Sequence, residues 1–227
     1  IVELAKNTPE LSILVEAVVA ADLAATLSTG TLTVFAPTNA AFAALLTELG
    51  VSKEALLANK PLLTAVLTYH VLGSTVARAD VPLGKAITPV SGGFFKIESN
   101  NGLKITDGRN RVSTITATDI QASNGVVHLV DRVLLPADKD IVATASALPD
   151  FSILVEAVVA AGLASTLQGT GPFTVFAPTN AAFAALLTEL GVSKADLLAD
   201  TVLLTKVLTY HVVPARVLKA EVPINTA

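Results

Sequence analysis

Apolar residues near the start of the chain recur every three or four positions, which is the spacing of one face of an α-helix. They are Leu11, Leu14, Val15, Val18 and Val19. The spacing predicts an amphipathic helix that buries all of these side chains. We expect the helix to end near Asp22, because Asp tolerates the left-handed conformation that often follows a helix.

The next part of the chain predicts a short strand and then more helices. Thr31–Phe35 is rich in β-branched and aromatic residues, which favours a strand. Thr38 or Asn39 caps a helix that runs to Leu49. A later helix carries a set of apolar side chains into the core, namely Leu62, Leu63, Val66, Leu67 and Tyr69.

After His70 the apolar positions alternate, which predicts β-strands. Two alternating runs flank Asn100-Asn101-Gly102, and an Asn-Gly pair favours a tight hairpin turn. Val112–Ile120 and Gly125–Leu135 continue the alternation and are expected to complete the sheet. Helices therefore come first and a mostly antiparallel sheet comes last, which predicts an α+β fold.

The chain contains a long internal repeat. Ser12–Ala21 recurs unchanged as Ser152–Ala161, and Thr33–Lys53 recurs unchanged as Thr174–Lys194. The period is too long for a solenoid unit, so each copy is expected to form a domain with its own core.

The two copies differ in length. Residues 1–137 form a complete module, 138–140 a short polar linker, and 141–227 a second module that lacks a counterpart of residues 87–136. Position 1 is not Met, so we expect the chain to begin inside a longer precursor whose signal peptide lies outside it.

Composition excludes several classes of function. Apolar residues make up 52% of the chain, yet no uninterrupted run is long enough for a membrane span. The net charge of −4 and the scattered Lys and Arg residues argue against a nucleic-acid partner. Cys is absent and no metal-ligand spacing occurs, so we expect neither a metal nor another cofactor.

The chain has three histidines, and none stands in a catalytic motif. His70 follows a core helix, where an imidazole can hydrogen-bond backbone groups left open at the helix end. Tyr69 beside it is expected to bury its ring and to direct its hydroxyl to a polar partner. Asp119 and His128 could meet across paired strands, but paired strands bring such residues together routinely. A hydrolase is therefore disfavoured.

Basic residues gather on the two predicted hairpins. They are Lys96, Lys104, Arg109 and Arg111. Such a patch could attract an anionic polysaccharide. An ordinary solvated sheet edge, on which Lys discourages aggregation, explains it equally simply and is the interpretation we favour.

Three segments resemble the fasciclin domain family. They are Thr33–Phe42, the Tyr69-His70 pair and Asn124–Pro136. The second module repeats the first two segments, with Tyr210-His211 as its pair, and lacks the third. The resemblance implies a wedge of β-strands flanked by helices, in a secreted, periplasmic or surface-anchored protein. The Ala-rich, Cys-free composition suggests a bacterial source.

The resemblance also implies a role in adhesion to cells or matrix, with binding placed at the pairs Tyr69-His70 and Tyr210-His211. We therefore expect a non-catalytic adhesion module, in which tandem copies raise avidity for a surface protein or polysaccharide. The alternative is a carrier that holds a lipid or another apolar molecule between helices and sheet.

The helices of the second module are expected to leave apolar residues without a sheet to cover them. These are Leu154, Val155, Val158, Val159, Leu203, Leu204, Val207 and Leu208. A patch of that size needs a cover. Strands further along a longer native chain, another copy of the protein or an exchanged segment would each supply one.

Overall fold

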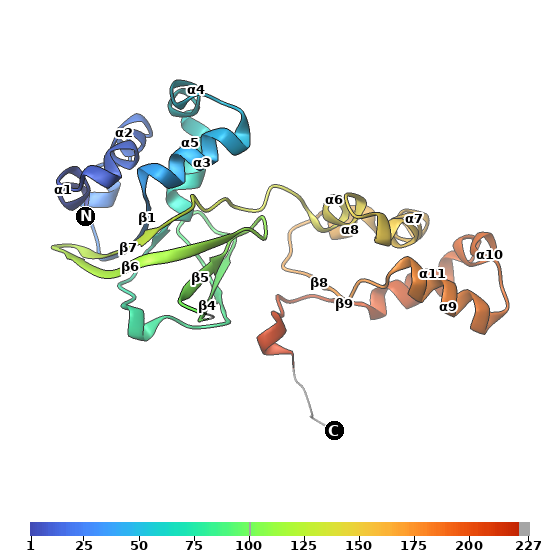
Figure 1. Ribbon diagram of the computed structural model, residues 1–227. Helices are drawn as coiled ribbons and strands as arrows, with labels where there is room; N and C mark the ends of the chain where they lie inside the picture. Colours follow the sequence, from blue (N-terminus) through green and yellow to red (C-terminus); the bar gives the residue numbers. More distant parts are fainter. Residues whose placement is uncertain (100, 223–227) are drawn as a thin grey trace. The chain divides into compact units, whose positions relative to one another are not determined.

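The computed structural model describes residues 1–99 and 101–222. The chain divides into two compact units, Ile1–Asp138 and Lys139–Ala227, called the first and second unit below (Figure 1). Asn100 of the expected hairpin turn and residues 223–227 of the second module lie outside the described residues. No helix among the described residues is long and apolar enough to cross a membrane.

Helices form most of the first half of the first unit. They are α1 (Val2–Lys6), α2 (Ser12–Ala20), α3 (Asn39–Leu49), α4 (Lys53–Ala58) and α5 (Lys60–Tyr69). The first unit also has single 3₁₀ turns at Pro9–Leu11, Thr26–Ser28 and Arg78–Asp80. Helices α2, α3, α4 and α5 lie together on one side of the sheet (Figure 1).

Local signals account for the helix ends. The hydroxyl of Thr38 accepts a hydrogen bond from the Ala41 N–H at 3.3 Å and so caps α3. Gly50 ends α3 with φ 65°, and Asp22 follows α2 with φ 61°. Both residues are in the left-handed region, as the sequence predicted for the end of α2.

The buried face of α2 differs from the prediction. Leu14, Ala17 and Val18 are buried, whereas Val15 is half-buried and Val19 is exposed. The prediction considered only large apolar side chains. Ala17 is also buried, because its small side chain lets α2 approach its neighbours closely. The buried stripe is therefore centred between Leu14 and Val18, and the prediction for Val19 is wrong.

Asn39 ties the start of α3 to the start of α2. Its side-chain oxygen accepts from the Ile13 N–H at 3.0 Å, and its amide nitrogen donates to the Pro9 carbonyl at 3.0 Å and the Ser12 hydroxyl at 2.9 Å. An Asp could accept but not donate, so the amide is required. Asn180 makes the equivalent three bonds in the second unit.

Seven strands of the first unit form one sheet. They are β1 (Leu32–Pro37), β2 (Val71–Leu72), β3 (Ala86–Ile87), β4 (Phe95–Ser99), β5 (Leu103–Thr106), β6 (Val112–Ala122) and β7 (Gly125–Val130). Their order is β2-β1-β7-β6-β5-β4-β3. Only the β1–β7 pair is parallel, so the expected α+β fold with a mostly antiparallel sheet is confirmed.

The last strand is shorter than predicted. Gly125–Leu135 was expected to be extended throughout, but β7 ends at Val130. The Asp131 carboxylate accepts from the Thr114 N–H at 2.6 Å and the Ser113 hydroxyl at 3.0 Å. They add to the backbone bond from the Asp131 N–H to the Thr114 carbonyl at 3.1 Å, after which the chain leaves the sheet and buries Val133, Leu134 and Leu135.

β1 separates two hydrophobic clusters because its side chains alternate between the faces of the sheet. Val34 and Ala36 point into a cluster formed with α2, α3 and α5. Phe35 points into a second cluster with Tyr69 and Phe95. This strand thus contributes to both cores of the first unit.

The second unit repeats the helical half of the first. Its elements are α6 (Ile141–Ser146), α7 (Ser152–Ala160), α8 (Ala164–Leu167), β8 (Thr174–Val175), α9 (Asn180–Leu190), α10 (Lys194–Ala199), α11 (Thr201–Tyr210) and β9 (Val212–Val213). Single 3₁₀ turns lie at Pro149–Phe151 and Lys219–Glu221. β8 and β9 form a two-stranded antiparallel sheet.

The sequence predicted that the apolar helix faces of the second unit are uncovered. This prediction is wrong for the residues that form the core of the unit. Leu154, Val158, Leu204 and Leu208 are buried within the unit. They belong to a cluster formed by α7, α9, α10 and α11, because the helices bury these side chains against one another rather than on a sheet. Of the remaining residues, Val155 and Val207 are half-buried, and Val159 and Leu203 are exposed.

We predict that the first unit folds alone, because it has its own cores and a polar boundary at Asp138. A protein of residues 1–138 should unfold in one cooperative transition when heated, with far-UV and near-UV circular dichroism changing together. A gradual change, or separate transitions in the two spectra, would show that it needs the second unit.

Candidate functional site

Tyr69, which ends α5, lies in the core of the first unit with 0% of its surface exposed. Its hydroxyl donates to the Phe94 carbonyl. Its ring meets Phe95 edge-on, with ring centroids 5.8 Å apart. The predicted arrangement of buried ring and bonded hydroxyl is confirmed. A partner cannot reach this side chain while the unit is folded.

His70 joins the helical half of the first unit to the segment after β7. Its Nδ1 lies 2.7 Å from the Val66 carbonyl, and its Nε2 lies 2.8 Å from the Leu134 nitrogen. A carbonyl only accepts and a backbone N–H only donates, so Nδ1 carries the proton and Nε2 accepts. The predicted bond to a backbone group at the helix end is confirmed.

Burial of this imidazole lowers the pKa of His70 from 6.5 to about 4, because desolvation disfavours the charged ring. The Val66 carbonyl and the Asp107 carboxylate act in the opposite direction, and Arg111 adds to the lowering. A second proton would also place an N–H against the Leu134 N–H. His70 is therefore neutral near pH 7 and bonded on both nitrogens.

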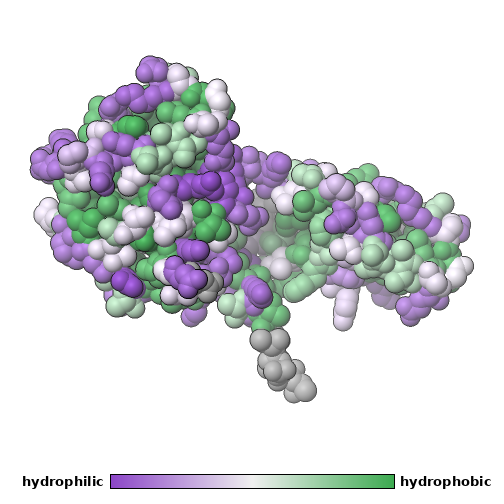
Figure 2. All heavy atoms as spheres, viewed as in Figure 1, coloured by the Kyte–Doolittle hydropathy of each residue, from purple (hydrophilic) through white to green (hydrophobic). Residues whose placement is uncertain are grey.

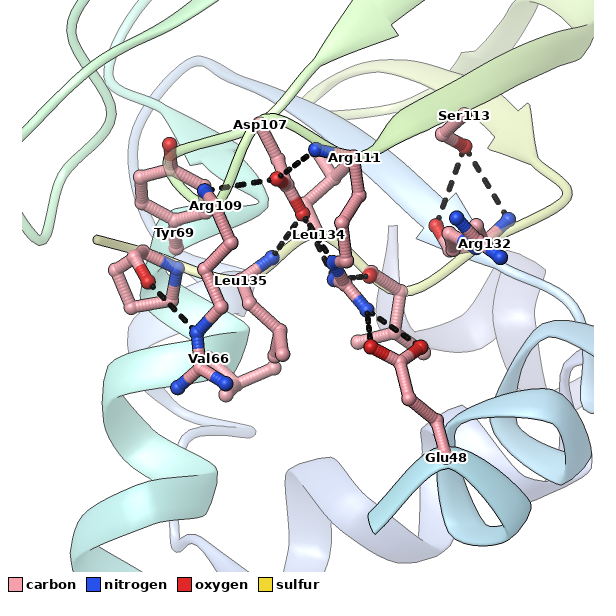
Figure 3. A network of polar contacts seen from close by, with 12 residues as sticks. Glu48, Val66, Tyr69, Asp107, Arg109, Arg111, Ser113, Arg132, Leu134 and Leu135 are labelled. Carbon is pink, nitrogen blue, oxygen red and sulfur yellow. Dashed lines mark hydrogen bonds and ion pairs between the residues drawn. The ribbon is translucent and has the colours of Figure 1, made fainter. Parts of the chain in front are cut away.

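Asp107 is the second polar centre of the first unit (Figure 3). Its side chain is 1% exposed, yet both oxygens accept several hydrogen bonds. Oδ1 accepts from the Arg109 and Arg111 N–H groups at 2.9 Å each, and Oδ2 accepts from the Leu135 N–H at 2.9 Å. The Arg111 guanidinium lies 2.7 Å from Oδ2. This carboxylate holds the β5–β6 turn against the segment after β7.

Arg111 extends the network to α3. Its guanidinium contacts both oxygens of Glu48 at 3.0 and 2.9 Å and donates to the Val133 carbonyl at 2.6 Å (Figure 3). Only 12% of the side chain is exposed. The residue that the sequence placed in a surface patch is therefore part of the packed structure.

The other members of the predicted basic patch also lie near acidic residues. Arg109 pairs with Asp138 at 3.3 Å, and Lys96 pairs with Glu98 at 3.1 Å. Lys104 is half-buried and stands opposite Glu98 across β4 and β5. An anionic polysaccharide would have to compete with these carboxylates, so the geometry favours the solvated edge.

Asp119 and His128 do come together, but through backbone. The Asp119 N–H donates to His128 Nδ1 at 3.2 Å, and His128 Nε2 lies 2.9 Å from the Val76 carbonyl. The Asp119 carboxylate instead accepts from the Arg78 N–H at 2.8 Å. His128 therefore has both nitrogens occupied by backbone and no carboxylate to orient it as a base.

The equivalent pair in the second unit has different surroundings. Tyr210 is 91% exposed, and His211 is half-buried. His211 keeps the bond from Nδ1 to the Val207 carbonyl, at 2.8 Å. Among the described residues no backbone N–H occupies its Nε2, which is the place that Leu134 takes on His70.

The first unit has an apolar hollow between α1, α2 and the sheet, where the carrier hypothesis would place a ligand. Ile1, Leu14, Val18 and Leu67 are among the residues that line it. Its volume is about 30 Å³, close to that of one water molecule. Sites for small ligands enclose roughly 300–1,000 Å³, so a lipid would need this hollow to open.

Sequence reasoning missed Asp107 as a structural centre. The Asp-Gly pair at Asp107-Gly108 signalled a turn, and Asp commonly bonds backbone N–H groups in turns. Its burial was not visible, because the segment that covers it, with the Leu135 N–H, is brought there by the tertiary fold.

The chain is similar to proteins of one known family. A family model for the fasciclin domain matches residues 9–136 and 149–226. The chain is 42% identical to Protein sll1483 of Synechocystis sp. over 140 residues, which are 60% of this chain and 73% of that protein. These matches confirm the resemblance that the sequence segments indicated.

Similarity extends to an animal protein and to a solved structure. The chain is 31% identical to human periostin over 189 residues, 83% of this chain and 21% of periostin. A FAS1 domain pair from the insect cell adhesion molecule fasciclin I has a TM-score of 0.45 and 18% identity. That match covers 89% of this chain and 72% of the solved one.

We predict that acid destabilises the first unit through His70. Its folded pKa of about 4 lies below the ordinary 6.5, so between these values the unfolded chain binds a proton that the folded chain does not. This contribution is complete above pH 6.5 and is lost as the pH falls to 4, by about 3 kcal/mol. Urea unfolding across this range measures it.

The variant His70→Ala should flatten that pH dependence and lower the free energy of unfolding at pH 7 by roughly 1–3 kcal/mol. His211→Ala is the matched control, because His211 is only half-buried and should leave unfolding of the first unit unchanged. Equal slopes for the parent chain and His70→Ala would contradict the assignment.

A second prediction concerns Asp107. Asp107→Asn turns an NH₂ group toward backbone donors and removes the buried partner of Arg111, so we expect a loss of about 3 kcal/mol. Asp138→Asn removes the exposed partner of Arg109 and should change stability by less than about 0.5 kcal/mol. Similar losses in the two variants, measured by urea unfolding, would show that the Asp107 network is not a stabilising centre.

Proposed function

This chain belongs to the fasciclin domain family, and we propose that it is a non-catalytic binding module of an exported, surface-associated protein. Its task is adhesion to a surface or matrix component, either a protein or a polysaccharide. The two units act together, each contributing a weak contact. The proposal extends the expectation drawn from the family resemblance and is supported by two features of the units.

The first feature is a set of exposed apolar side chains that occurs in both units. Val19 and Val159 are 61% and 60% exposed, and they occupy equivalent positions in α2 and α7. Two further pairs share the pattern of exposure, namely Leu49 with Leu190 and Val51 with Val192. We call these three side chains of each unit the repeated patch. This duplication is the observation that carries the proposal.

The second feature is the use made of buried polar side chains. His70, His128 and Asp107 are each bonded to backbone groups on two or more sides. A catalytic base needs a free lone pair directed at a substrate. The hydrogen bonds of these groups instead hold strands and helices together, which is the role expected in a structural module.

Tandem presentation explains how weak contacts suffice. Once one unit is bound, the other searches for its site at a high effective concentration, which raises avidity by up to about 10²–10⁴ without a new contact. Apolar residues such as Leu49 and Leu190 supply contact area, whereas surface charge supplies little net affinity. The number of repeated patches on one chain therefore controls retention.

This proposal predicts that retention depends on both patches. Beads coated with the chain are washed over collagen, alginate and bacterial cell envelopes, and we expect retention on at least one of these surfaces. Leu49→Lys or Leu190→Lys alone should weaken retention by about tenfold or more, and the double variant should abolish it. Retention no better than that of albumin-coated beads on every surface would overturn the proposal.

Two outcomes separate avidity from nonspecific adhesion. Val202→Lys is the matched control, because Val202 is an exposed apolar residue outside the repeated patch. It should leave retention unchanged. If it weakens retention as much as Leu190→Lys does, the surface binds through general hydrophobicity and not through the repeated patch.

A further inference from the structure

The chain contains two Asn-Gly pairs, Asn101-Gly102 and Asn124-Gly125, and the fold surrounds them differently. In such a pair the amide carbon of the Asn side chain lies within reach of the backbone nitrogen of Gly. Because Gly has no Cβ to obstruct the approach, that nitrogen can attack the amide carbon and close a succinimide ring. Whether the ring forms in a folded protein depends on how firmly the fold holds both groups.

The pairing of β1 with β7 holds Asn124-Gly125 in place. The Asn124 side-chain nitrogen donates to the Leu27 carbonyl at 3.0 Å, and the Asn124 carbonyl accepts from the Leu32 N–H at 3.1 Å. Gly125 pairs with Leu32 on one side and with Ala122 on the other. A Cβ on Gly125 would stand 1.8 Å from the Leu32 carbonyl oxygen, so the backbone is tightly enclosed. Ring closure here requires the strands to separate.

Asn101-Gly102 lies in the turn between β4 and β5, beyond the paired residues Ser99 and Leu103. Both members of the pair are exposed, and no atom lies within 4 Å of the position that a Cβ on Gly102 would take. Among the described residues, no hydrogen bond holds the Asn101 amide or the Gly102 N–H. Hydrophilic side chains, drawn purple, reach the surface where Figure 1 places this hairpin (Figure 2).

Asn110 shows that exposure of an Asn in a turn is not enough. It is exposed and has φ 59°, close to the 53° of Asn101. The residue after it is Arg111, whose N–H donates to the Asp107 carboxylate at 2.9 Å. The nitrogen that would attack is therefore engaged, and it belongs to a residue with a large side chain. Asn101 combines an exposed amide with an unobstructed nitrogen next to it.

We propose that Asn101 is a site of spontaneous deamidation, at which water converts the Asn into aspartate or isoaspartate while the protein stays folded. The Gly102 nitrogen loses its proton and bonds to the side-chain carbon of Asn101. The bond from that carbon to the amide nitrogen breaks, and ammonia leaves with the proton. Water then opens the succinimide at one of its two carbonyl groups, which gives aspartate or isoaspartate. No electrons are exchanged with another reagent, and water is the co-reactant.

The fold tolerates this change because the hairpin is anchored away from its turn. Ile97 and Ile105 are paired across β4 and β5, and both are 0% exposed. The product adds a negative charge to the turn, close to the paired residues Glu98 and Lys104. Isoaspartate also lengthens the main chain by a methylene group. The end of the hairpin therefore becomes more acidic as the protein ages, and this inference is independent of the repeated patch.

The test incubates the full folded chain in mildly alkaline buffer made with water enriched in heavy oxygen. Tryptic peptides are followed by mass spectrometry, and trypsin places Asn101 and Asn124 in separate peptides, residues 97–104 and 112–132. We expect Asn101 to convert at least about tenfold faster than Asn124, because Asn124 reacts only when its strands open. Heavy oxygen should enter the new carboxylate, and the rate should rise with pH, because the attacking nitrogen must lose its proton.

Urea and one variant separate the chemistry from the fold. In the unfolded chain both pairs are free, so their rates should become similar. Gly102→Ala places a Cβ beside the attacking nitrogen and should slow conversion of Asn101 by about tenfold or more in the folded chain, with circular dichroism verifying the fold. The comparison of the two sites in the parent chain needs no variant, so it is decisive even where this substitution disturbs the turn.

Three results would overturn the proposal. They are equal rates at Asn101 and Asn124 in the folded chain, conversion at Asn100 in place of Asn101, and an Asn101 that stays intact while the unfolded chain converts.

Discussion

The parallel pairing of β1 with β7 is the constraint on which the first unit depends. These strands are distant in the sequence, and α3, α4, α5 and the strands up to β6 lie between them. Pairing them closes that whole segment into one body. His70 repeats the closure a few residues further on, because it binds Val66 on one side and Leu134 on the other. The helical half of the first unit is therefore joined to the sheet half at two places.

The second unit shows what remains when this pairing is absent. Its helices still bury Leu154, Leu204 and Leu208 against one another, so a helical core does not need the sheet. The residues that change surroundings are those that would touch β7 and its neighbours. Tyr210 and Phe176 are exposed, whereas Tyr69 and Phe35 are buried. Identical sequence segments thus serve as core in one unit and as surface in the other.

Local signals allowed most elements to be predicted. Thr38, Gly50 and Asp22 mark helix ends through bonds and backbone angles that involve near neighbours only. The place of β1 between β2 and β7 was not predictable, because β7 is distant in the sequence. The end of β7 at Val130 was missed for a related reason, since Asp131 bonds to β6 rather than to its own neighbourhood.

The candidate site was likewise predictable only in part. The role of His70 followed from its place at a helix end. That of Arg111 did not, because its charge is balanced not only by Asp107, four residues earlier, but also by Glu48 of the distant helix α3. Charge spacing along a sequence shows that cations are close in the chain. It does not show which carboxylates the fold brings to them, so the internal network around Arg111 was missed.

Duplication followed by unequal surroundings has a physical consequence for binding. Both units present Val19 and Val159 to solvent in the same way, so this surface can act by repetition. Repetition raises avidity but adds no new specificity. Under the proposed function, the exposed side chains that both units share therefore control how strongly the chain is retained rather than which partner it selects.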